Sequence, residues 1–177
     1  ATCSTGGLYW SNDGNNWTKS SSFTNAHFVS IHLAKNSFAN TVGLLASDYT
    51  LTPYGYQGSL YWSEDGKTWT QCTGLQKNAG TLQVAFTRLM GSSTIRAIAT
   101  NGTHTFSSVD GKSWTELTMP ANVDFVSIVS SYEAEGGIYA YAYSSGTSDE
   151  NKGMWCYRQG SGTWVQAVHV PERISPV

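Results

Sequence analysis

Ser11-Asn12-Asp13-Gly14-Asn15-Asn16-Trp17 is the first of three copies of one seven-residue phrase, Ser-x-Asp-Gly-x-x-Trp. The frame returns at Ser63, Asp65, Gly66 and Trp69, and again at Ser108, Asp110, Gly111 and Trp114. Successive copies lie 52 and 45 residues apart, and self-similarity at about this period is typical of stacked supersecondary units such as propeller blades. The sequence therefore predicts a repeated architecture before any other feature is considered.

The phrase has the chemistry of a hairpin turn. Asp-Gly between two strand-like runs is a hairpin signal, because the turn needs a positive φ that glycine adopts without steric penalty. The serine and aspartate side chains can bond back to amides of the same turn, and the tryptophan can cover the seam to a neighbouring unit. None of this requires a substrate, so we interpret the repeated carboxylates as structural.

The phrase resembles the Asp-box, or BNR repeat, of sialidase-like β-propellers. A fourth stretch, 157–164, keeps the tryptophan but has Arg158 for the serine and Gly160 for the aspartate, and is interpreted as a degenerate copy. In the family the box sits between the third and fourth strands of a blade, away from the binding site. The resemblance implies that the boxes are scaffold and that ligands bind on the opposite face.

Apolar runs rich in Val, Ile and Phe predict the remaining strands, at 28–34, 41–47, 82–88, 95–100, 125–131 and 138–143. No segment has a useful helical period. The predicted fold class is therefore all-β, a β-propeller-type arrangement of four-stranded antiparallel blades. A single domain or propeller segment spans 1–177, with a hairpin at 5–20 and blades at about 27–72, 81–118 and 124–169.

The chain holds about three and a half blades, whereas propellers usually close into rings of about four to eight. It opens on a box hairpin and stops where another inner strand would begin. Open sheet edges favour association. The chain is therefore part of a longer protein, or a second copy completes the ring, or the terminal hairpin closes a small irregular one.

Composition limits the class of partner and the location. Only 12% of the 177 residues are charged, and the net charge is −2 without a basic stripe, which argues against nucleic acid. No apolar stretch reaches the ~20 residues of a membrane helix. Solubility then depends on Ser, Thr, Asn and Gly, a balance typical of secreted, cell-surface or virion-surface β-proteins.

No metal or cofactor is expected. Cys3, Cys72 and Cys156 match no zinc motif, and the histidines are scattered without ligand spacing. Free thiols are the simplest interpretation of the cysteines, and a Cys3–Cys156 disulfide that clasps the first and last units is the alternative.

The catalytic residues of the resembled sialidases are not matched. Those enzymes use three arginines, a tyrosine–glutamate pair and an aspartate, and carry Arg-Ile-Pro; this chain has four arginines and only Arg173-Ile-Ser-Pro176. A glycosidase needs two facing carboxylates. The loop-face candidates are interpreted as solvated charges outside any apolar setting: Asp48, Glu116, Asp124, Asp149 and Glu150. The sequence favours a protein that is not an enzyme.

One aromatic segment is explained by neither boxes nor strands. Residues 48–58 are predicted to form a long connection that carries Tyr49, Tyr54 and Tyr56, followed by Gln57. Exposed tyrosines on an anchored loop suit sugar stacking or protein contact, although they could instead pack on their own blade. The equivalent polar loop two blades on would add hydrogen bonds from Asp149 and Asn151.

These features favour a non-catalytic, lectin-like recognition or adhesion module that binds glycans or a protein receptor through the face opposite the boxes. The alternatives are a fragment of a larger propeller glycoside hydrolase, sialidase-like or endoglucanase-like, and an assembly scaffold. A homo-oligomer or the rest of a longer chain would complete the ring.

Overall fold

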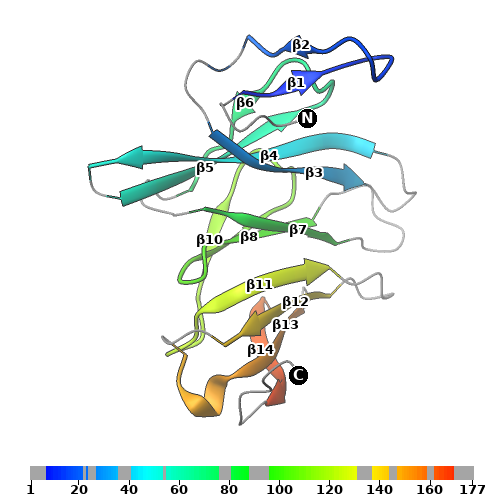
Figure 1. Cartoon of the computed structure of the whole chain (residues 1–177). Helices are drawn as coiled ribbons and strands as arrows, with labels where there is room; N and C mark the ends of the chain where they lie inside the picture. Colours follow the sequence, from blue (N-terminus) through cyan, green and yellow to red (C-terminus); the bar gives the residue numbers. More distant parts are fainter. Residues whose placement is uncertain are drawn as a thin grey trace, which may run out of the picture.

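The computed structural model describes residues 7–21, 23, 27–35, 41–53, 55–75, 81–87, 96–130, 137–143, 147–158 and 162–169. Within these ranges every regular element is a β-strand except one short 3-10 helix, η1 (Asp149–Asn151). A two-stranded hairpin and three four-stranded antiparallel sheets follow one another along the chain (Figure 1). The predicted all-β class with four-stranded antiparallel sheets is confirmed.

The hairpin consists of β1 (Tyr9–Trp10) and β2 (Thr18–Lys19). The first sheet contains β3 (His27–Lys35), β4 (Thr41–Thr52), β5 (Gly55–Ser63) and β6 (Thr70–Gln71). The second contains β7 (Gln83–Thr87), β8 (Arg96–Thr100), β9 (Thr105–Ser108) and β10 (Thr115–Leu117). The third contains β11 (Phe125–Ser130), β12 (Ile138–Ala142), β13 (Gly153–Arg158) and β14 (Thr163–His169).

Each four-stranded sheet is a meander in which neighbours in sequence are neighbours in space. The first strand of the second sheet, β7, contacts the first strands of both other sheets, β3 and β11, and Figure 1 shows these three strands stacked in order. The box turns join the third strand to the fourth in the first two sheets, so they lie toward the opposite edge of each sheet.

Three apolar clusters join successive units, and each contains the tryptophan that follows a turn between third and fourth strands. Trp69 packs with Leu8 of the hairpin, Trp114 with Leu45 and Leu60 of the first sheet, and Trp164 with Ile98 of the second. These three indoles are 4–7% exposed. Trp17 belongs to the first hairpin, which has no described unit before it, and remains 51% exposed.

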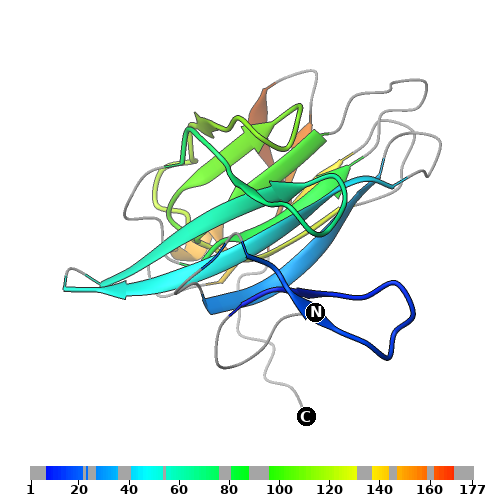
Figure 2. The same ribbon diagram turned by 90° about the horizontal axis from the view of Figure 1, so that it is seen from above.

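The predicted long connection at 48–58 is wrong. Strands β4 and β5 stay paired from Leu44↔Ser63 to Thr52↔Gly55, so the segment is two strand ends with a turn that begins at Pro53. Threonine and tyrosine favour strands. They are frequent in residues 48–58, and the β4–β5 hydrogen-bond ladder continues through this segment. Figure 2 shows the β4–β5 hairpin projecting beyond the other sheets.

The fourth hairpin does not repeat the box frame. Arg158 pairs with Thr163, and Trp164 lies within β14 opposite Tyr157, whereas Trp69 and Trp114 precede their fourth strands. The connection is therefore shorter than a box turn. Arg158 takes the ladder position that Trp62 has in the first sheet, opposite Thr70, and not the position of a box serine.

The predicted Cys3–Cys156 disulfide involves a residue outside the described part of the chain. Cys72 and Cys156 are buried free thiols, and Cys3 lies outside the described residues.

Candidate functional site

The same hydrogen bonds close all three box turns. In the second, Ser63 Oγ accepts from the Gly66 N–H at 2.8 Å and donates to Asp65 Oδ1 at 3.0 Å. Asp65 Oδ1 also accepts from the N–H groups of Lys67 and Thr68, each at 2.8 Å. The first and third turns repeat these bonds. The N–H donors of Thr68 and Lys67 hold the pKa of Asp65 below its usual range, so this carboxylate is an anion already satisfied by its own turn.

The third box turn stacks on the hairpin of the first sheet. The Thr73 N–H donates to the Lys112 carbonyl at 3.0 Å, and the Trp114 N–H donates back to the Thr73 carbonyl at 2.9 Å. Lys112 Nζ lies 2.7 Å from Glu64 Oε1 and 5.9 Å from the centre of the Trp62 ring. These contacts fix two box turns side by side, although their sequences are about 45 residues apart.

A groove of about 430 Å³ lies between these two turns, within the size range of small-molecule sites. Its lining includes Trp62, Glu64, Thr68, Thr70, Gln71 and Lys112. The groove is on the box side of the sheets, which the sequence assigned to scaffold.

The groove combines an apolar floor with a polar rim. Trp62 and Cys72 are 5% and 8% exposed and form the floor, whereas Glu64, Gln71 and Lys112 are exposed at the rim. The hydrogen bond from Lys112 holds the pKa of Glu64 below its usual range, so both members of the pair are charged at neutral pH. The rim offers donors and acceptors but no carboxyl with a raised pKa of the kind a general acid needs.

Cys72 is expected to resist thiol reagents. Burial raises the pKa of its thiol to about 12, and Sγ donates to the Gly111 carbonyl at 3.2 Å. Because the thiolate is the reactive species, iodoacetamide at pH 8 should leave Cys72 unmodified in the native protein and alkylate it in urea, as read by peptide mass spectrometry. Rapid native labelling would contradict this buried placement.

The residues predicted to bind ligand do not form one site. The backbones of Tyr49 and Tyr56 lie on β4 and β5, Gln57 is half-buried opposite Thr50, and Tyr54 is outside the described residues. Figure 1 places η1 beyond the second sheet from this hairpin. The two predicted groups are therefore separated by the β7–β10 sheet.

On η1 the predicted side chains serve local contacts. Asn151 Nδ2 donates to the Ala121 carbonyl and to Ser148 Oγ, each at 3.0 Å. Asp149 Oδ1 lies 2.5 Å from Lys152 Nζ. Asn151 thus ties η1 to the chain that enters the third sheet.

Asp48 is not the solvated loop charge that the sequence suggested. It lies on β4, is 2% exposed, and accepts the Ser59 N–H at 3.0 Å. Burial raises the pKa of this carboxyl to about 6. The same burial keeps the carboxyl from contact with a ligand. The raised pKa therefore affects the stability of the fold and not binding.

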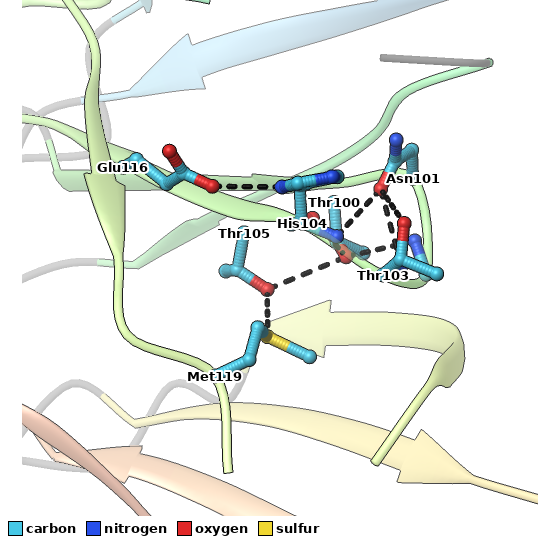
Figure 3. Close-up of polar contacts among 8 residues, drawn as sticks. Thr100, Asn101, Thr103, His104, Thr105, Glu116 and Met119 are labelled. Carbon is cyan, nitrogen blue, oxygen red and sulfur yellow. Dashed lines mark hydrogen bonds and ion pairs between the residues drawn. The ribbon is translucent and has the colours of Figure 1, made fainter. Parts of the chain in front are cut away.

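Glu116, another predicted loop carboxylate, lies on β10. Figure 3 shows it against His104, whose Nδ1 is 2.7 Å from Glu116 Oε1. Asn101 Oδ1 accepts the backbone N–H of His104 at 2.7 Å and that of Thr103 at 3.1 Å, and Thr105 Oγ1 donates to Met119 Sδ at 2.7 Å. The bonds to Asn101 hold the β8–β9 turn in shape.

No protein-family model and no curated protein matches this chain. A solved structure does: the fucose lectin from Kordia zhangzhouensis in complex with methyl-fucoside, with a TM-score of 0.50 and 13% identity. The alignment covers 80% of this chain and 100% of that one. The chain shares the β-fold of this lectin.

Two negative findings apply to the part of the chain that the structure describes. No group of three His, Cys, Asp or Glu side chains there could hold a metal ion. No helix among those residues has the length and hydrophobicity to cross a membrane.

Proposed function

We propose that this chain is a secreted or surface carbohydrate-recognition module, built as an Asp-box propeller segment, that binds neutral sugars in the groove between its second and third box turns. The observation that carries the proposal is the groove itself, a polar rim over an indole floor between two turns joined by backbone hydrogen bonds. The fold shared with a fucose lectin supports it.

The rim suits a polyhydroxylated ligand because sugar hydroxyls both donate and accept hydrogen bonds. Glu64 offers only acceptors, Lys112 only donors, and the Thr68 and Thr70 hydroxyls offer both. Bonds to charged partners are the stronger ones. The rim groups stand on turns whose backbone is already fixed, so little ordering entropy opposes binding.

The propeller part of the proposal is supported by repetition. Three antiparallel meanders recur at the blade period, with their first strands side by side, and identical bonds close the three box turns. Ring closure in this proposal requires a second copy or further chain, because the terminal sheets of an open row would expose edges.

Lys112→Ala should weaken the binding of a neutral monosaccharide by about tenfold, the scale of one hydrogen bond to a charged partner. The Lys112 side chain is exposed and an exposed ion pair adds little to stability, so the unfolding midpoint should change little. Titration calorimetry with L-fucose, galactose and N-acetylglucosamine would measure the effect.

Tyr56→Ala is the matched test of the rival surface on the projecting β4–β5 hairpin. Under the groove proposal its sugar affinity equals that of the wild type. Loss of binding in Tyr56→Ala, together with wild-type affinity in Lys112→Ala, would move the site to that hairpin and overturn the proposal.

A further inference from the structure

We propose that the junction between the first and second box turns is a second sugar site, selective for glycans that carry an anionic group such as sulfate. The inference rests on the proposed function of the neighbouring groove and extends it to a different ligand class.

The two junctions share one geometry. Trp10 pairs with Thr18 and Tyr9 with Lys19, in the same register as Trp62 with Thr70 and Tyr61 with Gln71. Lys67 Nζ lies 4.3 Å from the centre of the Trp10 ring, as Lys112 Nζ approaches Trp62. The Lys67 carbonyl accepts the Ser20 hydroxyl at 2.8 Å, which ties the second box turn to the first hairpin. The first junction therefore repeats the framework of the groove.

The charges at equivalent positions differ. Asn12 stands where the groove has Glu64, and Lys19 stands where it has Gln71. On the face of Trp10, Lys67 against Asp13 gives no net charge, whereas Lys112 against Glu64 and Asp65 gives −1 at the groove. Asn12 thus leaves Lys67 without the carboxylate partner that Lys112 has in Glu64.

The Asp13 carboxylate accepts its hydrogen bonds from residues of its own turn. Asp13 Oδ1 accepts the N–H groups of Asn15 and Asn16, and Oδ2 accepts from Asn16 Nδ2, each at 2.8 Å. Among the residues that the structure describes, neither Lys19 nor Lys67 takes part in an ion pair. Lys67 is exposed over the half-buried Trp10, whereas Lys19 pairs with Tyr9 and is exposed on the other face of the hairpin.

An ammonium group next to an indole, without a carboxylate partner, suits a sugar ring that bears an anion. Charge-assisted bonds to sulfate or carboxylate are stronger than neutral ones. The whole chain carries a net charge of −2, so its overall field does not attract anions, and selectivity must come from Lys67.

The test compares galactose with galactose 6-sulfate, which differ only in the sulfate. Each sugar is titrated into the ¹⁵N-labelled full chain, and the indole N–H resonances of Trp10 and Trp62 report the two junctions separately. We expect the sulfated sugar to bind at Trp10 about tenfold more tightly than galactose at low salt, and the advantage to shrink as ionic strength rises.

Charge-matched variants isolate the cause. Lys67→Gln should abolish the sulfate preference at Trp10, whereas Lys112→Gln, with the same change in net charge, should preserve it. Asn12→Glu should also abolish the preference, since it supplies Lys67 with the partner that Lys112 has. Glu64→Asn should create a preference at Trp62, and Asp149→Asn, which raises net charge equally, should not.

Equal affinity of the two sugars at Trp10, no shift of Trp10 with either sugar, or a sulfate preference that survives Lys67→Gln would overturn this inference. Its failure is separable from that of the proposed function. Neutral sugar binding at Trp62 alone rejects only the anionic site, whereas sulfate-selective binding at Trp10 with no response of Trp62 to either sugar supports the anionic site and counts against the groove.

Discussion

Replacing Asp48 by Asn should raise the free energy of unfolding at pH 7.5 by about 2–3 kcal/mol, the equivalent of the rise of its pKa from 3.8 to about 6. Burial disfavours the ionised carboxylate of the native protein, and the nearby charge of His27 and the Ser59 N–H offset this only in part. Asparagine retains an acceptor for that N–H and carries no charge.

The raised pKa of Asp48 determines how its contribution to stability changes with pH. The native state binds the Asp48 proton more tightly than the unfolded state, so wild-type stability from this group is full below about pH 4 and is lost as the pH rises through about 6. Urea unfolding of the wild type and Asp48→Asn should therefore coincide near pH 3.5 and separate by pH 7.5.

Asp65→Asn is the matched control. Its carboxylate has a lowered pKa because backbone N–H groups donate to it, so the variant should be less stable than the wild type at pH 7.5, opposite in sign to Asp48→Asn. A gain at pH 3.5 as large as at pH 7.5 in Asp48→Asn would mean that charge burial is not the cause.

Gly111→Ala should destabilise the protein by about 3 kcal/mol, the sum of a left-handed backbone conformation for a non-glycine residue and overpacking. Gly111 has φ +75°, and a Cβ there would lie 2.3 Å from Cζ3 of Trp62. The indole cannot retreat, because it is also packed against Gly43, where a Cβ would lie 2.1 Å from Cζ2.

Gly14→Ala separates the two causes. Gly14 occupies the same place in the first box with φ +76°, but nothing lies within 4 Å of a Cβ there. Gly14→Ala should lower the free energy of unfolding only by the cost of the left-handed backbone conformation, about 1–2 kcal/mol. Urea unfolding of both variants measures the difference, and equal losses would contradict the stacking of the third box turn on Trp62.

The strands and their antiparallel order could be predicted from sequence because the signals are local. Asp-Gly turns and runs of β-branched residues located most strands to within a few residues. The β4–β5 hairpin was missed because Gly55, Gly58 and Pro53 suggested a loop, whereas the intervening residues continue the ladder. Pairing across the sheet outweighed the composition of the segment.

The groove could not be derived from any single segment, since it forms only where Lys112 stacks on a hairpin some 45 residues earlier. A signal was nonetheless present. Lysine follows the box glycine in the second and third copies, and tryptophan precedes the box serine in the first and second. Each lysine lies over the tryptophan of the preceding copy. The burial of Asp48 had no such signal, because its neighbours in sequence are polar.

Binding to an array of neutral and acidic glycans tests the central claim most directly, with fluorescently labelled wild type and Lys112→Ala compared at equal concentration. We predict that the wild type binds a defined subset of neutral glycans and that Lys112→Ala loses that binding while it keeps its fold. Absence of binding to every glycan, or an unchanged pattern in Lys112→Ala, would contradict carbohydrate recognition in the groove between the second and third box turns.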